Sequence, residues 1–121
     1  DAYVEDNGQE EFALVAFVGG WAEGMYLGVS TVSLTDHSEL TGRIIEQMVI
    51  LDKLIEGLAP IEGSSKRVDV VLKHMRELYD FYINIPVIAE MEGNITEVEI
   101  PSTDMKLLGD KILKLRNLIV E

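Results

Sequence analysis

Residues 10–34 read EEFALVAFVGGWAEGMYLGVSTVSL, and this stretch decides the fold. Between Phe12 and Thr35 it holds one charged side chain, Glu23. A helix that is apolar on every side is buried either in protein or in lipid. Four small residues recur at every fourth position: Ala16, Gly20, Gly24 and Gly28. On a helix they form one strip, called here the small-residue strip, and we expect it to let another helix pack closely.

We expect this helix to be buried in protein and not in lipid. Roughly 20 apolar residues span a bilayer, so the length permits either environment. In a membrane, Glu23 would lie near the middle at a cost of a few kcal/mol. No Lys or Arg precedes Arg43 to set an orientation. The segments that follow read as amphipathic helices, and a buried central helix would cover their apolar faces.

The composition indicates one acidic domain, and it excludes several classes of function. The 121 residues suit a single domain over 1–121, and a hydrophobic content of 47% provides a core. The net charge is −12 and all ten basic residues lie at or after Arg43, which disfavours nucleic acid and anionic membrane surfaces as partners. The lack of cysteine excludes disulfides and thiolate chemistry. No signal peptide is readable at Asp1, so we expect a processed product or a fragment of a longer chain.

The rest of the chain predicts three more long helices. Apolar residues recur at three- and four-residue steps over 40–58, 68–82 and 105–119. Ser64 or Ser65 is the expected cap of the third helix, and Ser102 or Thr103 that of the last. Residues 1–5 read as the last turn of a preceding helix that began upstream, with Asn7-Gly8 as its stop signal. The sequence therefore predicts an all-α, up-and-down bundle of about four helices around a buried, Gly-rich central helix.

Residues 87–100 differ in character from the helices. Gly93-Asn94 is a two-residue turn signal between β-branched runs, which predicts a short β-hairpin, with an ordered loop as the alternative. One face of this hairpin would be acidic, with the residues Glu90, Glu92, Glu97 and Glu99. We interpret it as a solvated face, because a calcium site needs six to eight oxygens from a shaped loop.

No catalytic residue, metal site or cofactor is predicted. The chain lacks the G-x-G-x-x-G, Walker A, H-E-x-x-H and G-x-S-x-G motifs. Asp36, His37 and Ser38 are adjacent on a turn and cannot easily hold the geometry of a hydrolytic relay. His74 is expected on the surface.

One polar patch is a candidate site. Trp21, Glu23 and Tyr26 lie close together in the sequence of the apolar helix, and the Trp N–H and Tyr O–H groups need partners when they are buried. We expect Glu23 to accept such a hydrogen bond, a local structural role that is favoured over catalysis.

Residues 19–26, GGWAEGMY, resemble a G-G-W-x-E-x-x-Y-like stretch in uncharacterised helical secreted lipoproteins of Bacteroidetes. Residues 42–47 and 114–119 extend the resemblance more loosely. It implies that the chain is the C-terminal part of a protein whose N-terminus carries a lipid. The implied location is the cell envelope, periplasmic or anchored to the outer membrane, with membrane contact only through that lipid. The resemblance supplies no catalytic residue.

Three functions are compatible with these patterns. The first is a non-catalytic helical domain for protein interaction or envelope scaffolding, whose partner is another protein or the missing N-terminal segment. The alternative is a small-molecule binding module with a pocket near Trp21, Glu23 and Tyr26. The third is an enzyme or metal-binding protein that uses Glu23 or the acidic hairpin face. The sequence leaves open whether leftover apolar faces form a homodimer.

Overall fold

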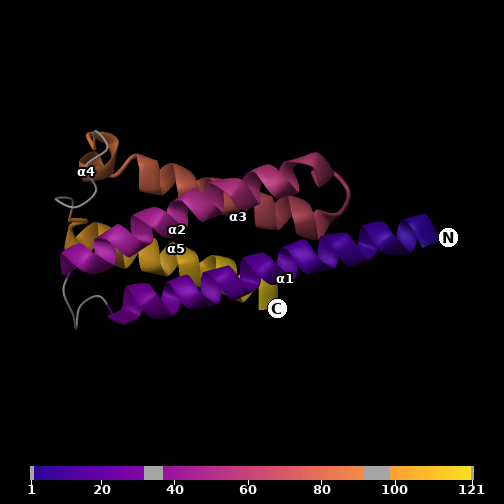
Figure 1. The fold of residues 1–121 in the computed structure, drawn as a ribbon, viewed down its shortest axis with the longest axis horizontal. Helices are drawn as coiled ribbons and strands as arrows, with labels where there is room; N and C mark the ends of the chain where they lie inside the picture. Colours follow the sequence, from indigo (N-terminus) through magenta and orange to yellow (C-terminus); the bar gives the residue numbers. More distant parts are fainter. Residues whose placement is uncertain (1, 32–36, 92–98, 121) are drawn as a thin grey trace.

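The computed structural model describes the backbone of residues 2–31, 37–91 and 99–120, and the side chains of 11–28, 41–91 and 99–120. Its helices are α1 (Ala2–Thr31), α2 (His37–Leu58), the 3₁₀ turn η2 (Ala59–Ile61), α3 (Lys66–Ile83), α4 (Pro86–Ala89) and α5 (Ser102–Val120). The four long helices run alternately in opposite directions (Figure 1). The described residues include no β-strand. The predicted all-α, up-and-down bundle is confirmed.

The core is built from one apolar stripe on each long helix. α1 and α3 each contact both α2 and α5, so the four helices enclose a single core. The predicted stripes of α3 and α5 are buried in full except for Tyr79, which is half-buried. The fully buried side chains at the centre are Val18, Met48, Leu51, Leu72, Met75, Leu78, Leu108, Ile112 and Leu115. Their spacing of three and four residues is what holds these segments as helices.

α1 is one wall of the bundle and not its central element. Val15, Val18, Ala22 and Met25 are buried, whereas Phe12, Phe17 and Leu27 are 75%, 61% and 55% exposed. Each of the other long helices offers one apolar stripe, so together they cover only one side of α1. The predicted burial on every side is therefore corrected: α1 has an inner apolar face and an outer one.

α1 also begins earlier than its sequence predicts. The helix is continuous from Ala2 to Thr31 and passes through Asn7 and Gly8 without a break. A glycine inside a helix costs about 1 kcal/mol relative to alanine, which a helix of 30 residues tolerates. The first turns of α1 extend past the end of α5 (Figure 1).

The small-residue strip does not receive another helix of this chain. Ala16, Gly20 and Gly24 are exposed, and Gly28 is half-buried. A Cβ atom added at Gly20, Gly24 or Gly28 would meet nothing within 4 Å. At 3.6 residues per turn, the positions of the strip lie about half a turn away from the buried residues Val15, Val18, Ala22 and Met25. The strip is therefore on the opposite side of α1. This corrects the prediction that a neighbouring helix of the bundle packs there.

Gly19 is the glycine that permits close packing. A Cβ atom at this position would lie 2.9 Å from Cγ2 of Ile119, so the last turns of α5 approach the backbone of α1 directly. Real Cβ atoms essentially never show so short a contact. A close contact between two helices, as the glycines suggested, is therefore present, but Gly19 makes it and not the neighbouring strip residue Gly20.

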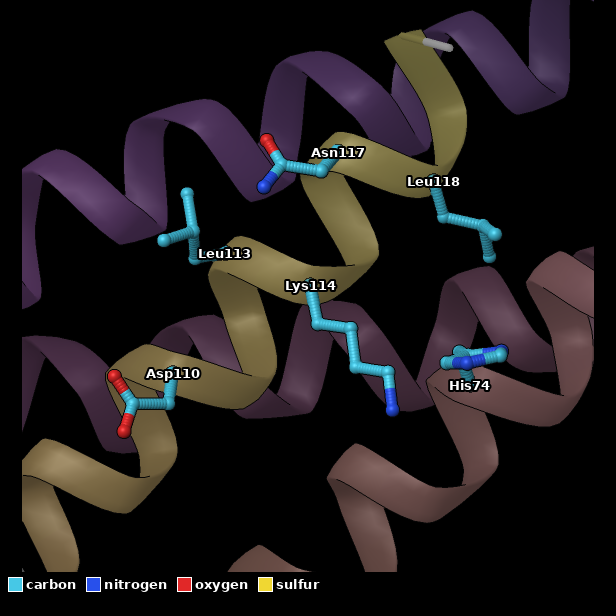
Figure 2. Close-up of a pocket in the computed structure, with 6 residues that line it drawn as sticks. All are labelled: His74, Asp110, Leu113, Lys114, Asn117 and Leu118. Carbon is cyan, nitrogen blue, oxygen red and sulfur yellow. The ribbon is translucent and has the colours of Figure 1, made fainter.

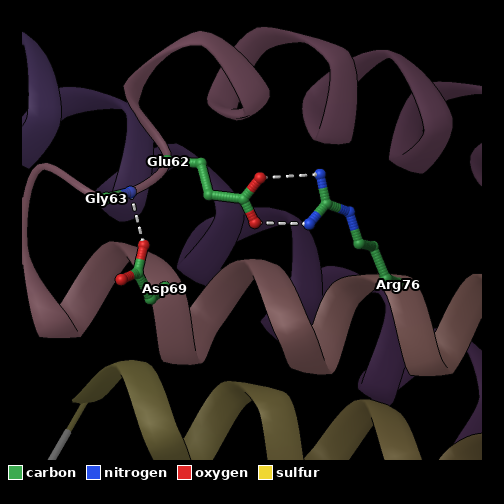
Figure 3. Close-up of polar contacts among 4 residues, drawn as sticks. All are labelled: Glu62, Gly63, Asp69 and Arg76. Atoms are coloured by element: carbon green, nitrogen blue, oxygen red, sulfur yellow. Dashed lines mark hydrogen bonds and ion pairs between the residues drawn. The ribbon is translucent and has the colours of Figure 1, made fainter.

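Polar contacts close the α2–α3 connection (Figure 3). Gly63 has a φ of +91°, a conformation that favours glycine, and its N–H donates to Oδ1 of Asp69 at 2.7 Å. Arg76 donates to both carboxylate oxygens of Glu62, at 2.6 and 3.4 Å. Ser65 caps α3, as predicted, by accepting from the N–H of Val68 at 3.1 Å. These contacts tie the connection at residues 62–65 to the first half of α3.

The segment around Pro86 is a helical turn and not a strand. Ile85 is extended, and Pro86 takes the first position of α4, where its missing N–H leaves no hydrogen bond unmade. Ile88 is buried on the core, which holds the turn in place. The hairpin prediction is therefore wrong for residues 87–89. Its turn, Gly93-Asn94, lies outside the described residues.

Two substitutions on adjacent glycines should have opposite effects on stability. Gly19→Val places a side chain against Ile119 and should lower the free energy of unfolding by about 1–3 kcal/mol. Gly20→Ala meets open space and should raise it by up to about 1 kcal/mol through helix propensity. Urea denaturation followed by circular dichroism measures both. Equal effects at the two positions would contradict the α1–α5 contact.

The buried phenol of Tyr82 should make the fold sensitive to alkaline pH. Burial raises the pKa of Tyr82 to about 12, and the neighbouring Tyr79 adds to the effect. An unfolded tyrosine ionises near 10, so unfolding releases a proton above that pH and stability falls as pH rises toward 12. The loss should reach about 2–3 kcal/mol. Tyr82→Phe should remove most of it in denaturation curves measured at a series of pH values, whereas an unchanged curve would contradict the assignment.

Candidate functional site

The most unusual surface of the described residues is the outer face of α1. It consists of Phe12, Ala13, Ala16, Phe17, Gly20, Gly24 and Leu27, all of them exposed and none of them charged. The large side chains stand at its two ends and on one edge, while the middle is nearly bare backbone. Helices of soluble domains normally carry polar residues on the side away from the core. This face is apolar instead.

Trp21 and Glu23 of the predicted polar patch do not bond to each other. Glu23 turns to α5, where its Oε2 accepts from Nε of Arg116 at 2.5 Å. The indole Nε1 of Trp21 is buried and has no hydrogen-bond partner among the described groups, so Glu23 does not accept from it. Tyr26 is half-buried against the core. The prediction that Glu23 accepts from Trp21 is corrected, because the indole N–H has no described partner and Glu23 pairs with the guanidinium of Arg116.

The acidic hairpin face is only partly described. Glu90 and Glu99 are both exposed, which agrees with a solvated role for these two side chains. Glu92 and Glu97 lie outside the described residues. Val87 and Ala89 belong to the helical turn α4. The first predicted strand of the hairpin therefore does not form at these residues, and it cannot align Glu90 and Glu92 on one face.

A cavity of about 490 Å³ opens between α3 and α5 (Figure 2). His74 stands on α3, and the remaining lining residues, Asp110, Leu113, Lys114, Asn117 and Leu118, come from α5. Lys114 extends from α5 toward α3 beside the imidazole (Figure 2). A second cavity of about 360 Å³ shares Leu118 and is lined by Lys66, Arg67, Val70 and Val71. Together the two cavities form one groove along α3 and α5, lined by both polar and apolar side chains. Its lining has three basic residues, Lys66, Arg67 and Lys114, and one acidic residue, Asp110.

The imidazole of His74 has a defined orientation in this groove. Its Nδ1 lies 2.9 Å from the carbonyl oxygen of Val70. A carbonyl oxygen can only accept, so Nδ1 is the donor in this contact. Arg67 is oriented as well, since its Nη2 donates to the carbonyl oxygen of Ile119 at 2.6 Å. The groove offers hydrogen-bonding groups but no serine, threonine or cysteine nucleophile.

No group that could hold a metal ion forms in the described part of the chain. Within residues 2–31, 37–91 and 99–120, no group of three or more His, Cys, Asp and Glu side chains comes close enough to hold a metal ion. The side chains of Asp36, His37 and Ser38 lie outside the described ones. In the same ranges, no helix has both the length and the continuous apolarity needed to cross a membrane.

Two features of the site were not predicted from the sequence. His74 was expected on the surface, and its position at a cavity depends on Lys114 and Leu118 from a helix 40 residues away. The outer face of α1 follows from the apolar residues on every side of this helix, which were interpreted as complete burial. One bundle covers only one side of such a helix, so the other side stays exposed.

The comparisons with known proteins give no match: no family model, no curated protein and no solved structure is similar to this chain.

The Glu23–Arg116 pair should contribute little to stability. Its side chains are 45% and 35% exposed, so water screens their attraction. A double-mutant cycle with Glu23→Gln and Arg116→Gln should give a coupling energy of about 0.2–1 kcal/mol in urea denaturation. The matched control is the pair Glu62 and Arg76, which is similarly exposed. A coupling energy for Glu23–Arg116 that is several times larger than that of Glu62–Arg76 would contradict the description of Glu23–Arg116 as a solvent-screened ion pair.

Proposed function

We propose that this chain is a non-catalytic helical domain for protein interaction, and that the outer face of α1 is its contact surface. The observation that carries the proposal is the exposure of Phe12, Phe17 and Leu27 on one uncharged helix face. Contiguous exposed apolar surface on a soluble domain commonly marks an interaction site.

The energetics favour a covered face over a solvated one. Phe12 and Phe17, at 75% and 61% exposure, and Leu27 leave on the order of 350 Å² of apolar surface in water. At roughly 25 cal/mol per Å², covering this area is worth about 9 kcal/mol before the costs of association are subtracted. The lipoprotein resemblance implies a location in the cell envelope, and scaffolding there is one setting for such a contact.

A second candidate function is small-molecule binding, and the α3–α5 cavity favours it. A volume of about 490 Å³ lies within the range of ligand pockets, roughly 300–1,000 Å³. The candidate pocket is thus beside His74 and Lys114, and neither described cavity includes Trp21, Glu23 or Tyr26. A small molecule that stays bound in native mass spectrometry at fixed stoichiometry, and is lost in His74→Ala, would support this function.

Photo-crosslinking tests the interaction surface directly. A photoreactive phenylalanine analogue at Phe17 should give a discrete protein adduct when the chain is expressed in cells of its source organism. The matched control is the same analogue at Val49, which is 55% exposed on α2 and outside the outer face of α1. Adducts at position 49 of equal yield, or none at position 17, would contradict the proposal.

A further inference from the structure

We infer that the outer face of α1 binds a second copy of the same chain, with the two α1 helices antiparallel and crossing at Gly20. This inference deepens the proposed function by naming the partner, and it therefore rests on that function. It is carried by the order of large and small residues on the face, by the area available and by the distribution of charge.

The face is complementary to itself in an antiparallel pair. When two copies cross at Gly20, residues whose numbers add to 40 lie at the same level along the axis, because each residue adds about 1.5 Å. Leu27 then lies level with Ala13, and Phe12 level with Gly28. Two of the three large side chains are thus level with small residues, and the third, Phe17, is level with Glu23, whose carboxylate pairs with Arg116 of its own chain.

Small residues also meet at the centre of this pair. Ala16 lies level with Gly24, and Gly20 meets Gly20 of the other copy. A Cβ atom at Gly20 or Gly24 meets nothing within 4 Å in one copy, so the space in front of both is available to a partner backbone. The next carboxylate along the helix, Glu23, is held by Arg116 of its own chain.

A parallel pair fits less well. With the helices parallel, each residue lies level with its own copy, so Phe12 meets Phe12, Phe17 meets Phe17 and Leu27 meets Leu27. Three such contacts would hold the helices apart and leave the glycines unfilled. Close helix packing requires small residues at the crossing and room beside it for the large ones.

The available area is sufficient for a specific pair. The exposed parts of Phe12, Phe17 and Leu27, together with the small residues between them, come to on the order of 500 Å² per copy. A pair therefore removes about 1,000 Å² from water, which is the lower bound for a specific interface. A moderate affinity is expected.

Charge gives the association a characteristic dependence on salt. Each copy carries a net charge of −12, so two copies repel one another over the rest of their surfaces. The outer face itself is uncharged, so salt screens the repulsion without weakening the contact. The dissociation constant should fall as salt is added, opposite to the behaviour of an acidic chain that binds a basic partner.

Sedimentation equilibrium of the purified chain tests the pair with one variant and a matched control. Gly20→Leu should raise the dissociation constant of the dimer by about tenfold or more, because it fills the crossing point. Gly57→Leu makes the same change at an exposed α2 position that also meets nothing within 4 Å, and it should leave association unchanged. Since both side chains enter open space in one copy, loss of the dimer cannot be attributed to misfolding, and circular dichroism checks this.

Disulfide trapping tests the direction of the helices. The chain has no cysteine of its own, so introduced thiols report without interference. Mixing the Ala16→Cys and Gly24→Cys variants should give a mixed disulfide in preference to either homodimer, since only an antiparallel pair brings these positions together.

Each outcome separates the two proposals. A monomer at all concentrations, or equal loss of association in Gly20→Leu and Gly57→Leu, overturns the pairing of two copies. If photo-crosslinking at Phe17 then gives an adduct with a different protein, the interaction function stands and only the identity of the partner fails. Homodisulfides of Ala16→Cys in place of the mixed product overturn the antiparallel arrangement.

Discussion

The contact between α1 and α5 is the constraint on which the rest of this structure depends. Gly19 brings Ile119 against the backbone of α1, and Val15, Val18, Ala22 and Met25 are buried on the same side. Once that side of the helix faces the core, 3.6 residues per turn place Gly20 and its neighbours on the opposite side. The arrangement of the core thus determines which apolar residues remain exposed.

Much of the bundle was predictable because three of its long helices are conventionally amphipathic. The periodicity of α3 and α5 named almost every residue that these helices bury, and Ser65 caps α3 as expected. α1 resisted prediction for a physical reason: with apolar residues on all sides, periodicity cannot say which side faces the core. The strip of small residues was a real pattern, yet the close contact is made by Gly19. The prediction of a strand from Val87 failed because Pro86, which was expected only to end the preceding helix, starts a new helical turn.

The two candidate sites differ in how much of each could be predicted from the sequence. The α3–α5 cavity joins His74 to residues 110–118, a juxtaposition that no local pattern encodes. The outer face of α1, by contrast, was visible as an excess of apolar residues beyond what one core needs. Its lack of charge in a chain of net charge −12 is consistent with a surface that is covered in use. Glu23, the one charged residue between Phe12 and Thr35, is directed to Arg116.

The central claim is that α1 has two faces with different partners, and methyl NMR with a soluble paramagnetic chelate tests it most directly. The account predicts that the methyl signals of Val18 and Ala22 are protected at every protein concentration. The signals of Leu27 should be broadened in dilute solution and become protected as the concentration rises. Protection of Leu27 at all concentrations, or broadening of Val18, would contradict the account.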